Sequence, residues 1–359
     1  MKADNADRYF SSAKSAFICG HLRDKNNYMK DILKYSIGLG LGIFLFYLAF
    51  RDISIDKVKG YFATAKWGWL IFSMCFAIVS HFVRALRWRM QLKASGYQVS
   101  VPTAFSAVMM TYMVNLALPR AGEVVRCTML YQSDKVPVPV SIGTVFTERV
   151  LDVLILAVLL LVSLGLANEQ ILGFWAEITR SKTGGISPLI YIGSTVFMLL
   201  IVGLFLFRKK IIALPITQKI MTFVKELLTA AWSIQKLENP LLFVFYSILI
   251  WVCYIMMMYV GLYCFEPIAS VSGEVNLLKF AFLGTVIGSL GMAIPIPGGI
   301  GPYHNAIIFS FIAFHIFPAE DMSRIMGQTF AFAFHTAQML VMLMGGLGGY
   351  AYLMLKKKE

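Results

Sequence analysis

Apolar runs of about the length needed to cross a bilayer recur along this chain. A transmembrane helix needs roughly 20 predominantly apolar residues. In this chain of 359 residues, 58% are hydrophobic and only 14% are charged. The sequence therefore predicts an all-α polytopic membrane protein with about six full transmembrane helices. These are expected at Ile32–Phe50, Trp67–Val83, Val150–Ala167, Ile190–Phe207, Leu241–Phe265 and Ile325–Leu355.

Two further apolar stretches are shorter and end in proline and glycine. Ala104–Leu118 is followed by Pro119 and Gly122, and Phe280–Ile294 is followed by a Pro-Gly-rich segment at 295–302. Proline removes a helical hydrogen-bond donor, and glycine adopts dihedral angles that other residues avoid. Because an apolar arm follows each interruption, we expect two broken helices, each a re-entrant hairpin or a pair of spans.

The basic residues favour one arrangement of these elements across the membrane. The chain has 32 Lys and Arg against 19 Asp and Glu, a formal net charge of +13. If each broken element returns to the side from which it entered and the N-terminus is cytoplasmic, 24 of the 32 Lys and Arg lie on the cytoplasmic side. Cytoplasmic loops carry such an excess. We therefore expect both termini in the cytoplasm, a location in the cell (inner) membrane, and anionic lipid as the partner of the basic loops, with no nucleic acid.

The crossing count also relates the two halves of the chain. Three predicted spans separate the broken elements, so the first opens from the cytoplasm and the second from outside. The two breaks also share a local pattern, because Ala117, Pro119 and Gly122 of the first have the same spacing as Ala293, Pro295 and Gly298 of the second. This pattern predicts an inverted repeat with halves at about 29–168 and 189–355. In transporters of that kind, substrate binds where broken helices meet near the midplane. Chance matches between Pro-Gly loops are the alternative.

Three basic and three acidic side chains cluster at the first break and at the start of the following apolar run. A balanced set suits burial, because an unpaired charge in a membrane is costly. The second half-helix would begin at the glycine of the break, and free N–H groups at a helix N-terminus favour an anion such as phosphate. Ordinary ion pairing at the cytoplasmic interface is the alternative. The predicted binding residues here are Arg120, Gly122, Glu123, Arg126, Glu148, Arg149 and Asp152.

The second break carries no charged side chain. Its glycines would expose backbone donors and let a ligand approach closely, although a simple packing turn has the same composition. A histidine just beyond the break could titrate or donate to a phosphate. The predicted binding residues of this element are Pro297, Gly298, Gly299, Gly301 and His304.

Other conspicuous residues have structural interpretations. His81 and His335 lie in apolar runs without matched acidic partners, and we expect them to pack between helices. Trp67 and Trp88 fit the aromatic belt at a membrane interface. The stretch Leu214–Leu237 has apolar residues at helical spacing and several lysines, which is typical of a helix on the cytoplasmic surface.

The remaining segments complete the domain organisation. Residues 1–28 are predicted to form a polar extension without a signal peptide, 29–355 the transmembrane domain, and 356–359 a basic tail. The five cysteines have no metal-ligand or CxxC spacing, and no Walker-type loop or HExxH pair is present in the sequence. We therefore expect no metal, no cofactor and no catalytic constellation.

Three strings resemble the signature stretches of a known family. They are Pro119–Arg126 (PRAGEVVR), Glu148–Asp152 (ERVLD) and Pro297–Gly301 (PGGIG). In this order, and with a resemblance that extends over nearly the whole chain from about Met29, they look like the flippase-like transmembrane domain of lysylphosphatidylglycerol synthases. The resemblance implies movement of a lipid between leaflets, without the C-terminal synthetase domain of those enzymes. Family members often carry an acidic residue where this chain has His304, which disfavours a cationic lysyl head group and favours an anionic or zwitterionic lipid.

The leading functional hypothesis is therefore a lipid flippase rather than an enzyme. Its partner would be a membrane phospholipid or a polyprenyl-phosphate-type lipid, held through the residues of the two breaks. The alternative is a membrane scaffold that recruits a lipid-modifying enzyme or glycosyltransferase through the basic surface near Leu214–Leu237.

Overall fold

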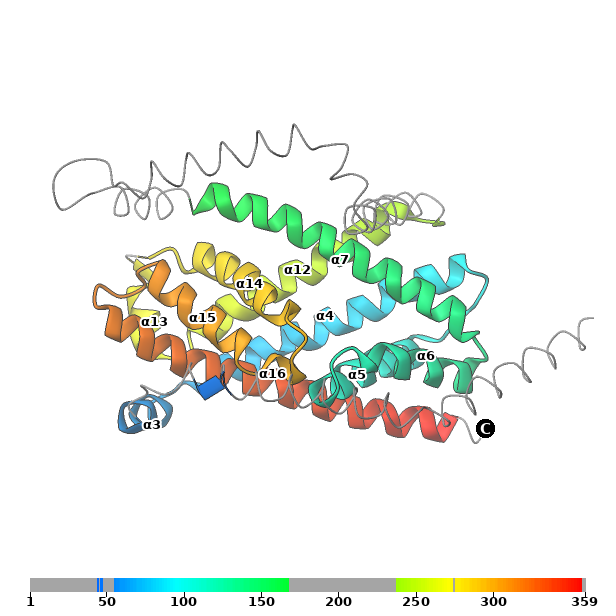
Figure 1. The fold of residues 1–359 in the computed structure, drawn as a ribbon, viewed down its shortest axis with the longest axis horizontal. Coiled ribbons are helices and arrows are strands. Elements are labelled where there is room, and N and C mark those ends of the chain that lie inside the picture. The colour runs from blue at the N-terminus through cyan, green and yellow to red at the C-terminus, as the bar shows by residue number, and fades with distance from the viewer. Residues whose placement is uncertain (1–43, 45, 48–54, 168–236, 274, 357–359) are drawn as a thin grey trace, which may run out of the picture.

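The computed structural model describes residues 44, 46–47, 55–167, 237–273 and 275–356, and within these ranges every regular element is a helix (Figure 1). The predicted helical class is thus confirmed. Four of the predicted spans correspond to helices that are long and apolar enough to cross a membrane: α4 (Trp67–Ala94), α7 (Val138–Leu166), α12 (Pro240–Leu262) and α16 (Glu320–Lys356). The predictions for 1–28, for 190–207 and for nearly all of 32–50 and 214–237 lie outside the described residues.

Both predicted helix breaks are present. In the first, α5 (Val101–Ala117) ends three residues before α6 (Ala121–Asp134) begins. In the second, α14 (Leu277–Ala293) is followed by a 3-10 turn, η3 (Pro297–Gly299), and then by α15 (Pro302–Ala313). The two helices of each pair pack against one another. The shorter helices α3 (Ile55–Ala63) and α13 (Glu266–Ser270), with the turn η2 (Val271–Gly273), complete the described chain.

Two of the spanning helices are longer than hydropathy alone predicts. α4 continues from Val83 to Ala94 because no glycine or proline interrupts it and its buried face continues. α7 begins at Val138 instead of Val150, directly after Pro137, and carries Pro139 in its first turn, where a missing N–H costs nothing. The two ends added to α4 and α7 carry charged residues.

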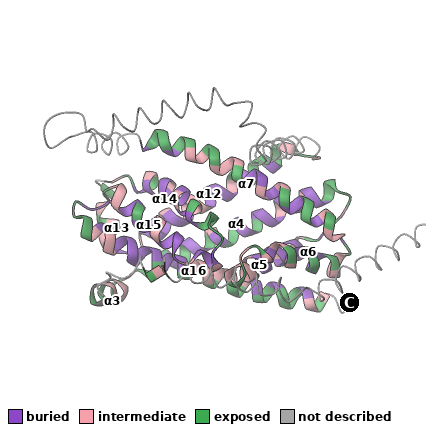
Figure 2. Cartoon of the chain, in the orientation of Figure 1, coloured by how far each residue is buried: buried purple, intermediate pink, exposed green. Residues whose placement is uncertain are grey.

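The described helices enclose two hydrophobic cores. One core joins the first half of α4 with α12, α14, α15 and the first half of α16. The other joins the second half of α4 with α5, α6 and the last turns of α16. α4 and α12 run antiparallel, with ion pairs from Lys93–Glu238 (2.7 Å) at one end to Lys66–Glu266 at the other. α4 and α16 therefore contribute to both cores, whereas α7 keeps a largely exposed apolar outer face (Figure 2).

Glycines set the distance between α16 and α5. A Cβ atom on Gly349 would lie 2.7 Å from the backbone oxygen of Ser106, and one on Gly346 would lie 2.3 Å from the Cβ of Met113. The neighbouring Gly348 has nothing within 4 Å of such an atom. The close approach to α5 is therefore made by one face of α16, as in small-residue helix interfaces of membrane proteins.

We expect Gly349→Ala to lower the melting temperature of the detergent-purified protein. The added methyl group meets backbone atoms that cannot rotate away, and overpacking of this kind costs about 1–3 kcal/mol. Gly348→Ala is the matched control, because it gives the same gain in helix propensity without a clash. Equal melting temperatures for the two variants would show that the α5–α16 contact is looser than described.

Candidate functional site

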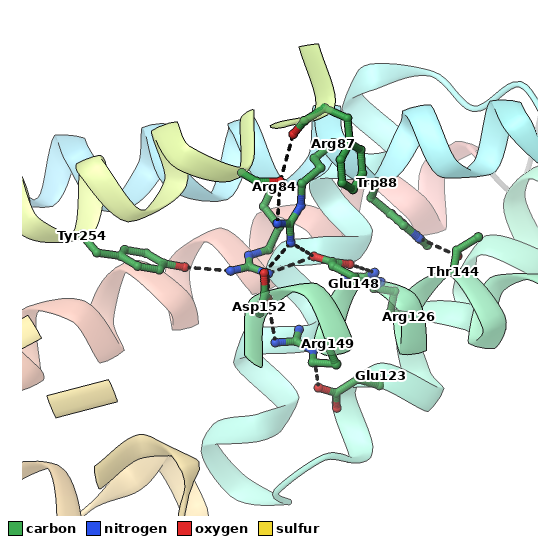
Figure 3. A network of polar contacts seen from close by, with 12 residues as sticks. Arg84, Arg87, Trp88, Glu123, Arg126, Thr144, Glu148, Arg149, Asp152 and Tyr254 are labelled. Atoms are coloured by element: carbon green, nitrogen blue, oxygen red, sulfur yellow. Dashed lines mark hydrogen bonds and ion pairs between the residues drawn. The ribbon is translucent and has the colours of Figure 1, made fainter. Parts of the chain in front are cut away.

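Charged side chains from α4 and α7 meet inside the helix bundle (Figure 3). Arg84 on α4 donates to Glu148 Oε1 at 2.9 Å and to Asp152 Oδ2 at 2.6 Å. Arg87, one turn further along α4, donates to Asp152 Oδ1 at 2.7 Å and to Ser247 on α12 at 3.2 Å. Glu148 and Asp152 were among the predicted binding residues, whereas Arg84 and Arg87 follow the predicted span Trp67–Val83 and were not among them. Arg84 and Arg87 are instead buried within the protein.

Glu148 is the centre of this cluster, and its carboxylate meets three arginines. In addition to Arg84 and Arg87, its Oε2 atom accepts from Arg126 at 2.6 Å. Both Glu148 and Arg126 are fully buried. The guanidinium of Arg126 also lies 3.8 Å from the centre of the Trp88 ring, whose Nε1–H donates to Thr144 at 3.0 Å. Trp88 therefore belongs to the core, and its predicted position in an interfacial belt is wrong.

Arg149 is held less tightly than the other three arginines. Its Nε lies 3.7 Å from Glu123 Oε1 and its Nη1 lies 3.7 Å from Asp152 Oδ2, both longer than a good hydrogen bond. Its side chain is 39% exposed, whereas those of Arg87 and Arg126 are fully enclosed. Arg149 thus has the freedom to engage a ligand.

Among the described residues, the cluster carries one more positive charge than negative. Four arginines (Arg84, Arg87, Arg126 and Arg149) face three carboxylates (Glu123, Glu148 and Asp152). A buried charge without full compensation is costly, so this centre favours an anion.

The first break places its other predicted ligands away from the buried cluster. Arg120 is exposed, has a left-handed backbone (φ 67°) and makes no ion pair with any described residue. Gly122 donates its N–H to Asn115 Oδ1 at 2.9 Å, and a Cβ atom there would lie 2.1 Å from Thr111 O. The glycine is thus required by the packing of α6 on α5. That Arg120 and Gly122 bind phosphate stays a prediction.

A cavity of about 230 Å³ lies beside the cluster, between the two hairpins. Its charged lining residues are Arg84 and Arg149, and the aromatic hydroxyls of Tyr112 and Tyr254 join them. Tyr254 accepts a hydrogen bond from Arg84 at 3.1 Å, so its own O–H is free to donate to a ligand. The cavity therefore presents cationic and hydroxyl donors to whatever it holds.

His81, which lines the same cavity, carries an unsatisfied polar atom. It is buried, its ring lies 4.4 Å from that of Tyr112, and its Nδ1 has no hydrogen-bond partner in the described structure. Such atoms are rare in folded proteins and call for an explanation. His81 was predicted to pack between helices. It does so, but it also faces the cavity.

The remaining lining is apolar with a few hydroxyl and amide groups. Thr285 and Ser289 on α14, Tyr303 on α15 and Gln338 on α16 contribute the polar atoms. Methionines from α12, α14 and α16 supply adaptable apolar walls. The lining therefore comes from both hairpins and from the long helices that surround them.

The second break lies next to this cavity without lining it. Gly298, Gly299 and Gly301 have positive φ angles (57°, 67° and 96°) that favour glycine. The Gly301 N–H donates to His304 Nδ1 at 3.3 Å, and the His304 ring lies 4.9 Å from that of His335. These contacts explain the residues as a turn that caps α15. Direct ligand binding by Pro297, Gly298, Gly299, Gly301 and His304 stays a prediction.

A spacing signal in the sequence could have identified the missed arginines. Arg84 and Arg87 are three apart, and Glu148 and Asp152 are four apart, so each pair shares one helix face. Two facing helices with complementary pairs of this kind can neutralise one another. No group of three or more His, Cys, Asp or Glu side chains among the described residues could hold a metal ion.

Glu148→Gln should destabilise the protein strongly. The change leaves three arginines around an uncharged amide and raises the excess positive charge of the cluster from one to two. Removing one partner of a buried ion pair costs about 3–5 kcal/mol. Thermal unfolding of the purified protein measures the loss. Glu320→Gln, which removes an exposed ion pair with Arg324, is the control and should have little effect. Similar melting temperatures would contradict the central role of Glu148.

Comparisons with known proteins identify one family. Residues 35–346 match the sequence model of the lysylphosphatidylglycerol synthase TM region. Over 113 residues the chain is 28% identical to the UPF0104 membrane protein MJ1595 of Methanocaldococcus jannaschii, a stretch that covers 30% of this chain and 34% of that relative. No solved structure matches the chain. This multi-pass membrane protein therefore belongs to the lysylphosphatidylglycerol synthase transmembrane-region family.

Proposed function

We propose that this protein moves a phosphate-containing lipid between the leaflets of the membrane and holds its head group at Arg84 and Arg149. The observation that carries the proposal is the excess positive charge that the described residues place beside a cavity. Arg87 and Arg126 are fully enclosed in the cluster, whereas Arg84 and Arg149 line the cavity and are the arginines that an anion there can reach. Arginine is well suited to phosphate because of its planar set of donors.

The size of the cavity supports binding of a head group and not of a whole lipid. Pockets that enclose drug-sized molecules measure about 300–1,000 Å³, and this cavity measures about 230 Å³. The hydrocarbon chains of the lipid would stay in the bilayer. Transfer of a polar head group is the slow part of lipid movement across a membrane, because the hydrocarbon region offers no polar partners.

We further propose that the two hairpins are related by an inverted repeat. α5 and α14 have the same length, 17 residues, and each leads into a break. The helices before the hairpins, α4 and α12, pack against each other. The helices after them contact the opposite hairpin, because α16 packs on α5 and α7 contacts α14. Leu116 O lies 3.6 Å from the place of a Cβ atom on Gly298, so the breaks are neighbours.

The proposed orientation keeps both termini cytoplasmic. Four of the basic residues in the charge count, Arg84, Arg87, Arg126 and Arg149, lie in the cluster and say nothing about the side of the membrane. Without them, 20 Lys and Arg lie on the proposed cytoplasmic side and 8 on the other. The positive-inside rule therefore still favours this orientation.

Arg149→Gln should slow lipid transfer in reconstituted vesicles. The assay measures how fast an acyl-labelled fluorescent phosphatidylglycerol becomes accessible to a membrane-impermeant quencher. The loss of a hydrogen bond to a charged group costs about 1.5–3 kcal/mol, which corresponds to a rate about 10- to 100-fold lower.

Arg324→Gln is the matched control, because Arg324 lies on the protein surface in a pair with Glu320 and does not line the cavity. It should transfer lipid at the rate of the unchanged protein. Vesicles with protein that show no faster transfer than protein-free vesicles would overturn the proposed function. The scaffold hypothesis predicts instead that Arg149→Gln has no effect.

A further inference from the structure

We propose that the cavity selects a phosphate attached to an uncharged polyol, such as glycerol, inositol or a sugar, and rejects amine-bearing head groups. This inference rests on the proposed function and names the class of lipid that the same site takes. Its basis is the arrangement of charge and of hydrogen-bond donors and acceptors around the cavity.

The charged groups of the lining have one sign. Arg84 and Arg149 are its charged members, and no carboxylate belongs to it among the described residues. Asp152 and Glu148 point into the cluster, where they accept from Arg84 at 2.6 and 2.9 Å. An ammonium group in the cavity would therefore meet two guanidinium groups without a carboxylate of its own. Discrimination by an unpaired like charge is a general route to specificity.

A second part of the lining offers hydrogen-bond acceptors. The hydroxyl of Thr285 donates to Ala281 O at 2.7 Å, and that of Ser289 donates to Thr285 O at 2.7 Å. Because each hydroxyl has a single O–H, which is already donated to a backbone carbonyl, the Thr285 and Ser289 oxygens retain only lone pairs, and both residues line the cavity. A ligand hydroxyl can donate to them, and the side chain of Gln338 can act as both donor and acceptor.

The unpartnered histidine completes this description. His81 lines the cavity, and its buried Nδ1 lacks a partner in the described structure. Its tautomers allow either donation to a phosphate oxygen or acceptance from a hydroxyl. The O–H of Tyr254 is available to a phosphate oxygen, since the tyrosine oxygen already accepts from Arg84. One cavity thus contains side chains that can donate to a phosphate and side chains that can accept from the hydroxyls of a polyol.

Head-group preference is tested with vesicles that contain acyl-labelled phosphatidylglycerol, phosphatidylinositol, phosphatidylethanolamine or phosphatidylcholine. The two polyol lipids should be transferred at least about tenfold faster than the two amine-bearing lipids. A factor of this size corresponds to one like-charge contact in a partly desolvated site. A phosphate attached to a polyol occurs both in glycerophospholipids and in lipid-linked sugars. A short-chain polyprenyl-phosphate hexose, added as a competitor, distinguishes these two kinds of substrate. Strong competition indicates a lipid-linked sugar, and weak competition indicates a glycerophospholipid.

A charge switch at Gln338 tests whether the cavity itself sets this preference. Gln338→Glu has the same shape and adds a carboxylate to the lining. We expect slower transfer of phosphatidylglycerol, faster transfer of phosphatidylethanolamine, and a shift of their ratio by about tenfold. Gln132→Glu on α6, outside the cavity, is the control and should leave the ratio unchanged.

Ser289→Ala provides a second variant if Gln338→Glu does not fold. It removes an acceptor and should reduce the advantage of phosphatidylglycerol and phosphatidylinositol without inverting it. Equal or faster transfer of amine-bearing lipids by the unchanged protein overturns the head-group assignment while leaving the proposed function intact. Absence of transfer for every lipid overturns both.

Discussion

The contact of Glu148 with three arginines is the interaction on which the polar interior depends. Its carboxylate joins Arg84 and Arg87 on α4 to Arg126 on α6, and it does so from α7. None of these side chains could be buried alone, because an isolated charge in a medium of low dielectric constant carries a large solvation penalty. Together they connect three helices and orient the first hairpin against the long helix α4.

The same cluster contains two kinds of arginine. Arg87 and Arg126 are enclosed by carboxylates, by Ser247 and by the Trp88 ring. Arg84 and Arg149 reach the cavity, and Arg149 makes only long contacts with its carboxylates. Arg87 and Arg126 hold the geometry, and the two arginines that line the cavity are preorganised for a ligand. Such preorganisation strengthens binding because less ordering is needed when the ligand arrives.

The long helix α16 joins the two hairpins. Its first half packs on α15 and its last turns pack on α5, where glycines allow close contact. Its middle contributes Phe334, Gln338 and Met342 to the cavity. The cavity therefore lies where the two hydrophobic cores meet, and its shape depends on both. This position agrees with the proposal that the hairpins form two halves of one transport unit.

Much of the architecture was predictable from the sequence, because the forces that set it are local. The length of each apolar run determined the helical membrane class, and proline and glycine determined where the two helices break. The acidic pair Glu148 and Asp152 was recognised because charges in an apolar run are conspicuous. Arg84 and Arg87 were missed because they follow the apolar run of α4, where a positive charge is usually solvated. Only the tertiary structure brings them opposite Glu148 and Asp152, 61 to 68 residues away in sequence. Only the packing of both hairpins against α4, α12 and α16 creates the cavity, since no single segment contains its lining.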